Sequence, residues 1–228
     1  MDNLKRHHRG LTNPRGTLLA IGVLVLAAAG SGRGETEISG AVAGVWTREG
    51  NPYIVVDSTW VPQGESLLLQ AGVRVLFGEG QGLHVFGLFR SFGSDNAEDS
   101  INIQVAEGVE HWRGIRFYGR NQAEINYTYI TCPDFALYFD HNCTFSMNHS
   151  AIRADVGAMR GLDFNSIVLV GCDITLSYSY IQNKGESIVT NGGTIIIDHS
   201  EVGFDIFNPE VIPGLHGQGT SIYLHRLL

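Results

Sequence analysis

The sequence predicts an all-β solenoid, in which short strands stack coil upon coil, and three observations lead to this prediction. The same order of apolar and polar residues recurs along the second half of the chain. Apolar side chains alternate within short runs, which is the period of a β-strand. Glycine makes up 29 of the 228 residues, and this high content indicates many tight turns and few helices.

The first thirty residues are predicted to be a secretory signal peptide. A basic start, MDNLKRHHRGLTNPRG, precedes the apolar run TLLAIGVLVLAAAG, which ends in small residues. The run is shorter than the roughly 20 apolar residues that span a bilayer. A single membrane anchor and a misassigned start codon are the alternatives. A signal peptide implies that the mature chain is secreted, periplasmic or on the cell surface.

The mature chain is acidic and is expected to form one domain. Without residues 1–30 it carries 11 basic and 22 acidic side chains, a net charge near −11. Such a surface repels the phosphates of nucleic acid, so nucleic-acid binding is not expected. The remaining length, about 198 residues, suits a single domain.

Four segments in the second half align with one another, and a fifth begins near the C-terminus. Each full segment opens with a small and then an apolar residue, and closes on a polar residue followed two positions later by a hydroxyl. The segments are Gly114–Ile130, Ala136–Ile152, Gly161–Ile181, Ser187–Val202 and a partial copy from Ser221. Strands this short cannot bury their apolar faces alone, whereas stacking about 4.8 Å apart gives one continuous core.

Stacking in register predicts columns of equivalent side chains. The inward apolar column is expected to hold Ile115, Leu137, Leu162, Ile188 and Ile222. A small inward hydroxyl column, just after a bend, should hold Thr128, Ser150, Ser179 and Ser200, and the bend itself Asn126, Asn148, Ser177 and Asp198. Cys143 and Cys172 also share a column, where stacked buried thiols are favoured and a disulfide is the alternative.

A series of short motifs runs through the first half of the mature chain. They are Gly44-Val45-Trp46, Pro52-Tyr53, Val61-Pro62-Gln63-Gly64, Ser66–Gln70, Gly72-Val73, Leu76-Phe77-Gly78 and Trp112-Arg113-Gly114-Ile115-Arg116-Phe117. This order resembles secreted bacterial proteins of the pectin-lyase-like superfold, over residues 38–202. The resemblance implies a right-handed parallel β-helix, here of about seven coils. The chain departs from the family pattern around Gly87 and at Ile101–Gln104.

The expected organisation has four parts. A signal peptide at 1–30 and a short linker at 31–43 precede an N-terminal cap with the first coils at 44–113 and repeated coils at 114–228. The last copy stops at SIYLHRLL, in mid-coil and without a visible cap. Because an open coil exposes apolar core and strand edges, we expect a truncated longer protein, or another domain or chain that covers this end.

The resemblance implies that catalytic groups would lie on outward positions of one parallel sheet. In this chain those positions are Arg116, Tyr138, Asp163 and Val189. Glycoside hydrolysis needs two carboxylates, and the column offers Asp163 alone. A lyase of acidic sugars would need acids that hold Ca²⁺ and a basic residue that takes the proton. A solvated sheet face is therefore favoured, no catalytic residue is assigned, and Arg116, Tyr138 and Asp163 are kept as candidates for ligand binding.

A second set of candidates lies at the bend. Tyr127, His149, Tyr178 and His199 alternate phenol and imidazole along one column. The functional interpretations are a stacking platform for sugar rings or, for the two histidines, a metal site, but a shared zinc ion needs ligands about 2.1 Å from the metal. The structural interpretation, in which turn residues simply cover the coil edge, is favoured.

No cofactor or metal is expected. Asp95, Glu98 and Asp99 suggest Ca²⁺ but lack the spacing of an EF-hand, so a solvated acidic loop is favoured. The sequence therefore predicts a secreted or cell-surface module with a structural or carbohydrate-binding role, with a polysaccharide as the possible partner and without a supported catalytic site. The alternative is a polysaccharide lyase or glycoside hydrolase, or the N-terminal part of one.

Overall fold

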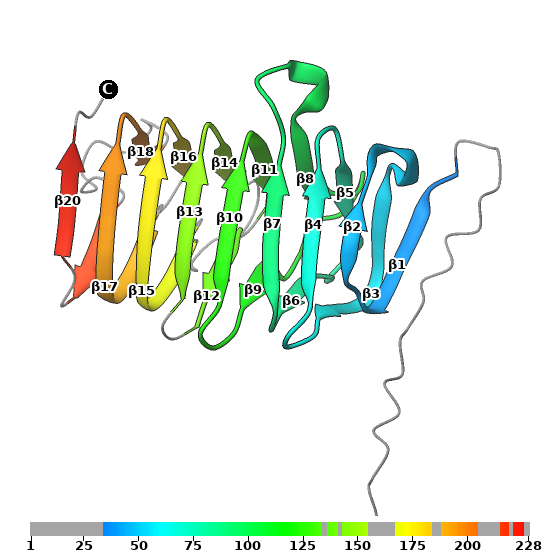
Figure 1. Ribbon diagram of the computed structural model, residues 1–228, viewed down its shortest axis with the longest axis horizontal. Helices are drawn as coiled ribbons and strands as arrows, with labels where there is room; N and C mark the ends of the chain where they lie inside the picture. The colour runs from blue at the N-terminus through cyan, green and yellow to red at the C-terminus, as the bar shows by residue number, and fades with distance from the viewer. Residues whose placement is uncertain are drawn as a thin grey trace, which may run out of the picture.

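The protein is all-β, and its strands run parallel to their partners in stacked layers along one long axis (Figure 1). The computed structural model describes residues 34–133, 136–140, 143–154, 167–183, 188–204, 215–218 and 221–225. The strands follow one another as in a β-helix-like solenoid, because β4 pairs with β7, β7 with β10 and β10 with β13. Among the described residues, no helix has the length and apolar character needed to cross a bilayer.

Three parallel sheets, named here A, B and C, form the sides of the solenoid. Sheet A contains β2 (Gly44–Trp46), β4 (Ser66–Gln70), β7 (Leu88–Phe92), β10 (Gln122–Asn126), β13 (Thr144–Asn148), the ends of β15 (Ile167–Ser177) and β17 (Ile188–Asp198), and β20 (Ser221–His225). Sheet B contains the starts of β1 (Thr36–Ala41) and β3 (Tyr53–Val61), then β5 (Arg74–Phe77), β8 (Ile101–Val105), β11 (Thr128–Cys132), β14 (Ala151–Ala154), β16 (Tyr180–Asn183) and β18 (Glu201–Phe204). Sheet C contains the ends of β1 and β3, then β6 (Leu83–Val85), β9 (Ile115–Phe117), β12 (Leu137–Phe139), the starts of β15 and β17, and β19 (Leu215–Gln218).

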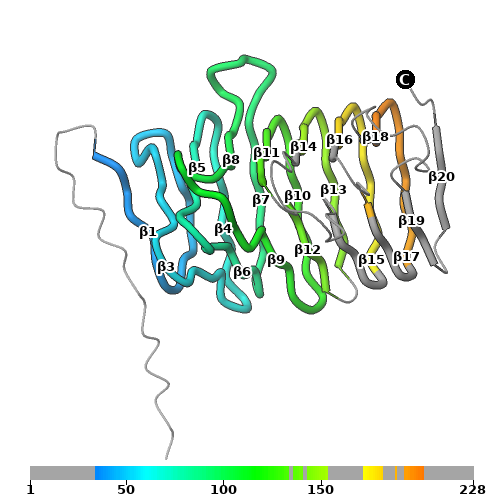
Figure 2. Tube along the Cα trace, turned by 180° about the vertical axis from the view of Figure 1, so that it is seen from behind, coloured from blue at the N-terminus to red at the C-terminus, as the bar shows by residue number. Residues whose placement is uncertain are grey.

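Strands that bend connect these sheets into one hydrogen-bonded system. β1 and β3 pass from sheet B into sheet C, whereas β15 and β17 pass from sheet C into sheet A. Two short 3₁₀ turns, η1 (Arg48–Gly50) and η2 (Ala97–Asp99), interrupt the strands. The second turn belongs to the loop between β7 and β8, which projects beyond the neighbouring coils (Figures 1 and 2).

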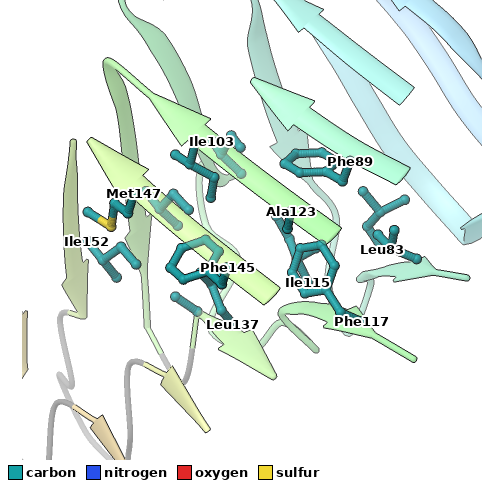
Figure 3. Close-up of a cluster of buried hydrophobic side chains, with 14 of the residues drawn as sticks. Leu83, Phe89, Ile103, Ile115, Phe117, Ala123, Leu137, Phe145, Met147 and Ile152 are labelled. Carbon is teal, nitrogen blue, oxygen red and sulfur yellow. The ribbon is translucent and has the colours of Figure 1, made fainter. Parts of the chain in front are cut away.

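The core is a set of inward columns, in which like side chains lie over like. Strands such as β9 bury every second residue, so Ile115 and Phe117 are buried while Arg116 between them is half-exposed. Phe117 stacks on Phe139 of the next coil with ring centroids 4.5 Å apart. The close-up of the core shows Ile115, Leu137, Phe145 and Met147 pointing into the same interior (Figure 3).

The predicted apolar column is right in its first members and wrong at two positions. Ile115 pairs with Leu137 as expected, but Leu137 pairs with Ile167, and Ile167 with Ile188. The place expected for Leu162 is therefore taken by Ile167, and Leu162 lies outside the described residues. Ile188 continues to Leu215, and Ile222 instead pairs with Ile195 in sheet A.

Leu162 was predicted instead of Ile167 because the extra residues of this longer coil were assigned to the wrong side of the strand. The GLDF segment mimics the small-apolar-x-Phe opening of the other copies, and this places the extra residues after it. In the structure the extra residues fall before the strand, between the end of β14 at Ala154 and the start of β15 at Ile167. The corresponding connection in the preceding coil runs only from Cys132 to Leu137.

In the four coils from β10 to β18, the corner between sheets A and B is a single residue in the left-handed region. Tyr127, His149, Tyr178 and His199 have φ values of 47, 46, 47 and 45°. One residue with positive φ turns the chain from one strand directly into the next, so the polar residue before it and the hydroxyl after it keep fixed positions. This geometry explains the polar–x–hydroxyl signature of the sequence.

The hydroxyl column after this corner is confirmed. Thr128, Ser150, Ser179 and Ser200 are all buried, at 0–5% exposure. Each hydroxyl donates to the backbone carbonyl two residues earlier, over 2.8–3.0 Å. Each of the last three also accepts a hydrogen bond from the backbone N–H one coil earlier, over 3.0–3.4 Å. The column therefore pairs buried N–H groups that the corner takes out of the strand ladder.

Candidate functional site

The outer face of sheet C carries a group of aromatic and basic side chains. Pairing in register sets Trp60 beside His84, His84 beside Arg116 and Arg116 beside Tyr138, so these four residues form one outward column. A second column lies one residue beyond the ends of β6 and β9. It holds Phe86, whose N–H donates to the Val61 carbonyl, and Tyr118, whose N–H donates to the Val85 carbonyl. We define the sheet C patch as Trp60, His84, Phe86, Arg116, Tyr118 and Tyr138.

Ring contacts connect the two columns of the sheet C patch. Phe86 stacks on Tyr118 with centroids 4.8 Å apart and planes 16° apart. His84 stacks on the same phenol at 5.7 Å, and its Nδ1 lies 2.9 Å from the Tyr118 hydroxyl oxygen. The Arg116 guanidinium carbon lies 5.8 Å from the Tyr138 ring centroid, which is a cation–π distance. These contacts hold the rings in a fixed arrangement on a flat surface.

Solvent reaches the apolar members of the sheet C patch. Trp60 is 39% and Phe86 45% exposed, although a soluble surface gains little from exposed aromatic rings. Large apolar side chains gathered at one place of a surface mark interaction sites. Flat aromatic faces next to a guanidinium and an imidazole suit a ligand that combines apolar ring faces with hydroxyl or carboxylate groups, as a sugar does.

The local electrostatics favour a neutral imidazole at His84. Burial first, then the positive charges of Arg116 and Arg113, lower the pKa of this histidine below its ordinary value. In the tautomer with Nδ1 unprotonated, the Tyr118 hydroxyl donates a hydrogen bond to that nitrogen. The pair is therefore a neutral base in contact with a phenol, beside two arginines.

The structure brings together two of the three candidates that the sequence placed on this face. Arg116 and Tyr138 are neighbours in register. Asp163 lies outside the described residues, and the next position of the column, beside Tyr138, belongs to Val168. Val189 pairs with Val168, so Val189 keeps its predicted place in the column.

The corner column forms a continuous stack of rings. Centroid distances are 4.8 Å from Tyr127 to His149, 4.9 Å from His149 to Tyr178 and 4.8 Å from Tyr178 to His199, with planes within 15°. Both faces of His149 and of Tyr178 are therefore covered by neighbouring rings, and a sugar meets only their edges. The Tyr178 ring also separates the two imidazoles, so they do not share one metal ion.

The acidic loop between β7 and β8 is tied to the body of the protein. Asp99 forms an ion pair with Arg48, whose guanidinium also donates to the Glu98 carbonyl over 2.7 Å, and Asp99 accepts from the Ser94 hydroxyl over 3.2 Å. In the part of the chain that the structure describes, no group of three or more His, Cys, Asp or Glu side chains is arranged for a metal ion.

Four members of the sheet C patch were missed at the sequence level. Trp60, His84, Phe86 and Tyr118 lie in the segments TWVP, LHVF and IRFY, which have the same alternation as LYFD at Leu137–Asp140. Extending the repeat alignment upstream of Gly114 would have placed Trp60, His84 and Phe86 in the outward columns, and Tyr118 lies inside the first repeat, directly after Phe117. Comparisons with models of protein families, with curated proteins and with solved structures find no match.

Proposed function

We propose that the protein is a secreted or cell-surface right-handed parallel β-helix module of the pectin-lyase-like kind, which binds a polysaccharide on the sheet C patch. The N-terminal thirty residues support secretion, because they have the pattern of a signal peptide. Handedness and family rest on the motifs between Gly44 and Phe117. Binding rests on one observation, the exposed cluster in which Phe86, Tyr118 and His84 stack beside Arg116.

A linear polysaccharide fits this surface better than a globular partner does. The patch is flat because it follows one face of a parallel sheet, and its rings repeat from coil to coil at strand spacing, about 4.8 Å. An extended chain of sugars lying across several coils would meet one ring after another. Arg116 and His84 would supply the polar contacts that fix the sugar's orientation.

Titration of the purified protein against a panel of soluble polysaccharides, neutral and acidic, tests this proposal. Trp60→Ala and Tyr118→Ala should each weaken binding about fivefold, since one aromatic contact is worth roughly 1 kcal/mol. Tyr129→Ala is the matched control, because Tyr129 is 48% exposed but belongs to β11 in sheet B. Equal affinity in all three variants, or no binding to any polysaccharide in the panel, contradicts the proposal.

A polysaccharide lyase is the second candidate, favoured by the His84–Tyr118 contact. In an acidic sugar, the His84–Tyr118 pair could remove the proton next to the carboxylate while Arg116 neutralises the developing charge. The C–O bond to the leaving sugar then breaks, and the proton passes to that oxygen. The product carries a new double bond, which absorbs ultraviolet light. Tyr118→Phe keeps the ring stack and removes only the hydroxyl, so a lyase should lose turnover and keep its affinity. Absence of any unsaturated product from the unaltered protein rejects this second candidate.

A further inference from the structure

Two buried cysteines lie at equivalent positions of neighbouring coils. Cys143 directly precedes β13, and Cys172 lies in β15 one residue before Asp173, which pairs with Thr144. Both are buried thiols that form no disulfide in the structure. The third cysteine, Cys132, is also buried but belongs to β11 in sheet B.

The two thiols converge on the same small region at the corner between sheets C and A. The Cys143 thiol donates to the Asp140 carbonyl oxygen over 3.0 Å, and the Cys172 thiol donates to the same oxygen over 3.1 Å. The Cys143 backbone N–H donates to Cys172 Sγ over 3.2 Å. Each sulfur therefore lies in the immediate surroundings of the other.

From this geometry we propose that Cys143 and Cys172 are the site of a disulfide that ties two consecutive coils together. Equivalent positions of adjacent parallel strands have Cα atoms about 4.8 Å apart, inside the range of roughly 4.4–6.8 Å that disulfides span. On the far side of Cys172, its partner in register is Gly193, which has no side chain to compete for the space. Cys132 lies in sheet B instead, where its thiol donates to the Arg153 carbonyl oxygen.

The chemistry requires a disulfide-bearing oxidant, such as glutathione disulfide or a dithiol oxidase. One cysteine attacks this oxidant as a thiolate and forms a mixed disulfide. The second cysteine then displaces the oxidant. Two S–H bonds are lost, one S–S bond forms within the chain, and the oxidant leaves as two thiols. An oxidising compartment, where the predicted signal peptide would deliver the chain, supplies such oxidants.

The timing of this reaction follows from burial. The neighbouring Cys172 and burial raise the pKa of the Cys143 thiol well above its ordinary value, so the folded protein holds it as an unreactive thiol. The bond therefore forms while the coils are still closing, and the finished fold then protects it from reductants. A chain that folds in a reducing environment keeps both thiols, as described above.

Refolding of the full chain in glutathione buffers of increasing oxidised fraction tests the proposal. After denaturation and alkylation, intact mass should show one free thiol per chain, Cys132, and peptide mapping should join Cys143 to Cys172. The oxidised chain should be about 2 Da lighter before alkylation and should melt roughly 5–10 °C higher than the reduced chain. Three free thiols at the highest oxidised fraction, or a bond that includes Cys132, overturns the proposal.

Single substitutions provide matched controls. Cys132→Ser should leave no free thiol and retain the dependence of the melting temperature on the redox buffer. Cys143→Ser should leave two free thiols and abolish that dependence. Because the first variant also removes a buried thiol, a general loss of stability affects both, and the redox dependence separates them. A melting temperature of Cys143→Ser that still rises with the oxidised fraction counts against the assignment.

Discussion

A side chain in this protein has the role that its position in the coil gives it. The four residues with positive φ illustrate this, because tyrosine and histidine occupy a conformation that most side chains avoid. The backbone cost, about 1 kcal/mol for each residue, is offset by ring stacking between coils, worth roughly 0.5–1.5 kcal/mol for each pair. The stack therefore stabilises corners that a single ring would not.

The hydroxyl column provides a test at the same scale. Ser179→Ala removes the acceptor of the Ser150 backbone N–H, and a buried donor without a partner costs about 1–3 kcal/mol. We expect the free energy of unfolding, measured with urea, to fall by that amount. Ser146→Ala in β13 is the control, since Ser146 is only half-buried in sheet A, and its substitution should change stability by less than about 0.5 kcal/mol.

Glycine at one position is required by both conformation and space. Gly193 has φ = 92°, and a Cβ there would overlap the backbone carbonyl of Cys172 on the neighbouring strand. Gly193→Ala should therefore lower the free energy of unfolding by about 2–5 kcal/mol. Gly40 has φ = 76° with no atom within 4 Å of the added carbon, so Gly40→Ala should cost only about 1 kcal/mol. Equal losses in the two variants, measured by chemical denaturation, would show that space is not the cause.

Individual residues also show how far the sequence predicts the structure. The hydroxyl column and the corner residues could be predicted because a one-residue corner leaves no freedom in spacing. Leu162 was misplaced because GLDF satisfies the same local pattern as the true strand, which begins at Ile167. Pattern alone does not distinguish two candidate strands when a connection between them varies in length. The pairing of Leu137 with Ile167 decides between them.

At the scale of elements, the outer face of sheet C brings together polar and aromatic side chains from several strands. β6 contributes His84, β9 contributes Arg116, and Tyr118 follows β9. The sequence predicted Arg116 and Tyr138 for this face, but not the ring contacts across coils, because these depend on register upstream of the recognised repeats. The strand pairing in the structure supplies this register directly.

The imidazole of His84 gives this element a pH dependence. Its pKa lies below the ordinary value of about 6.5, because of burial and the charges of Arg116 and Arg113. Just below pH 6.5 the unfolded chain therefore binds more protons than the folded one, and stability falls as the pH falls. His84→Gln should reduce this dependence in urea denaturation at a series of pH values. Titration of the imidazole by NMR checks the cause directly, and a pKa at or above 6.5 refutes it.

At the scale of the whole molecule, repetition makes one coil a removable unit. Sheets A, B and C all step by 22 residues between the coil of β10 and the coil of β13. Removing residues 119–140 takes out one such step and keeps every later strand in register. We expect this shortened protein to fold, with an unchanged far-ultraviolet circular dichroism spectrum and a length reduced by about 4.8 Å in small-angle scattering.

The control for this deletion is one residue shorter. Removing residues 125–145 joins Glu124 to Ser146, which occupy the same position of their strands. It therefore leaves one extra residue inside a strand, and a shift of one residue moves every inward side chain of the rest of that strand to the outer face. That variant should be insoluble or lack the cooperative unfolding of the parent. If both deletions fold equally well, stacking in register is not what specifies this molecule.

The three corners of the solenoid differ in what they tolerate. Where sheet A meets sheet B in the coils from β10 to β18, one residue makes the turn and its ring stacks on a ring of a neighbouring coil, so an insertion there would break the stack. Where sheet B leads to sheet C, the connection already spans Cys132 to Leu137 in one coil and Ala154 to Ile167 in the next, while the strands on either side keep their partners. A foreign peptide inserted in that connection should leave the paired strands intact, and insertions in successive coils would lie next to one another along the same edge.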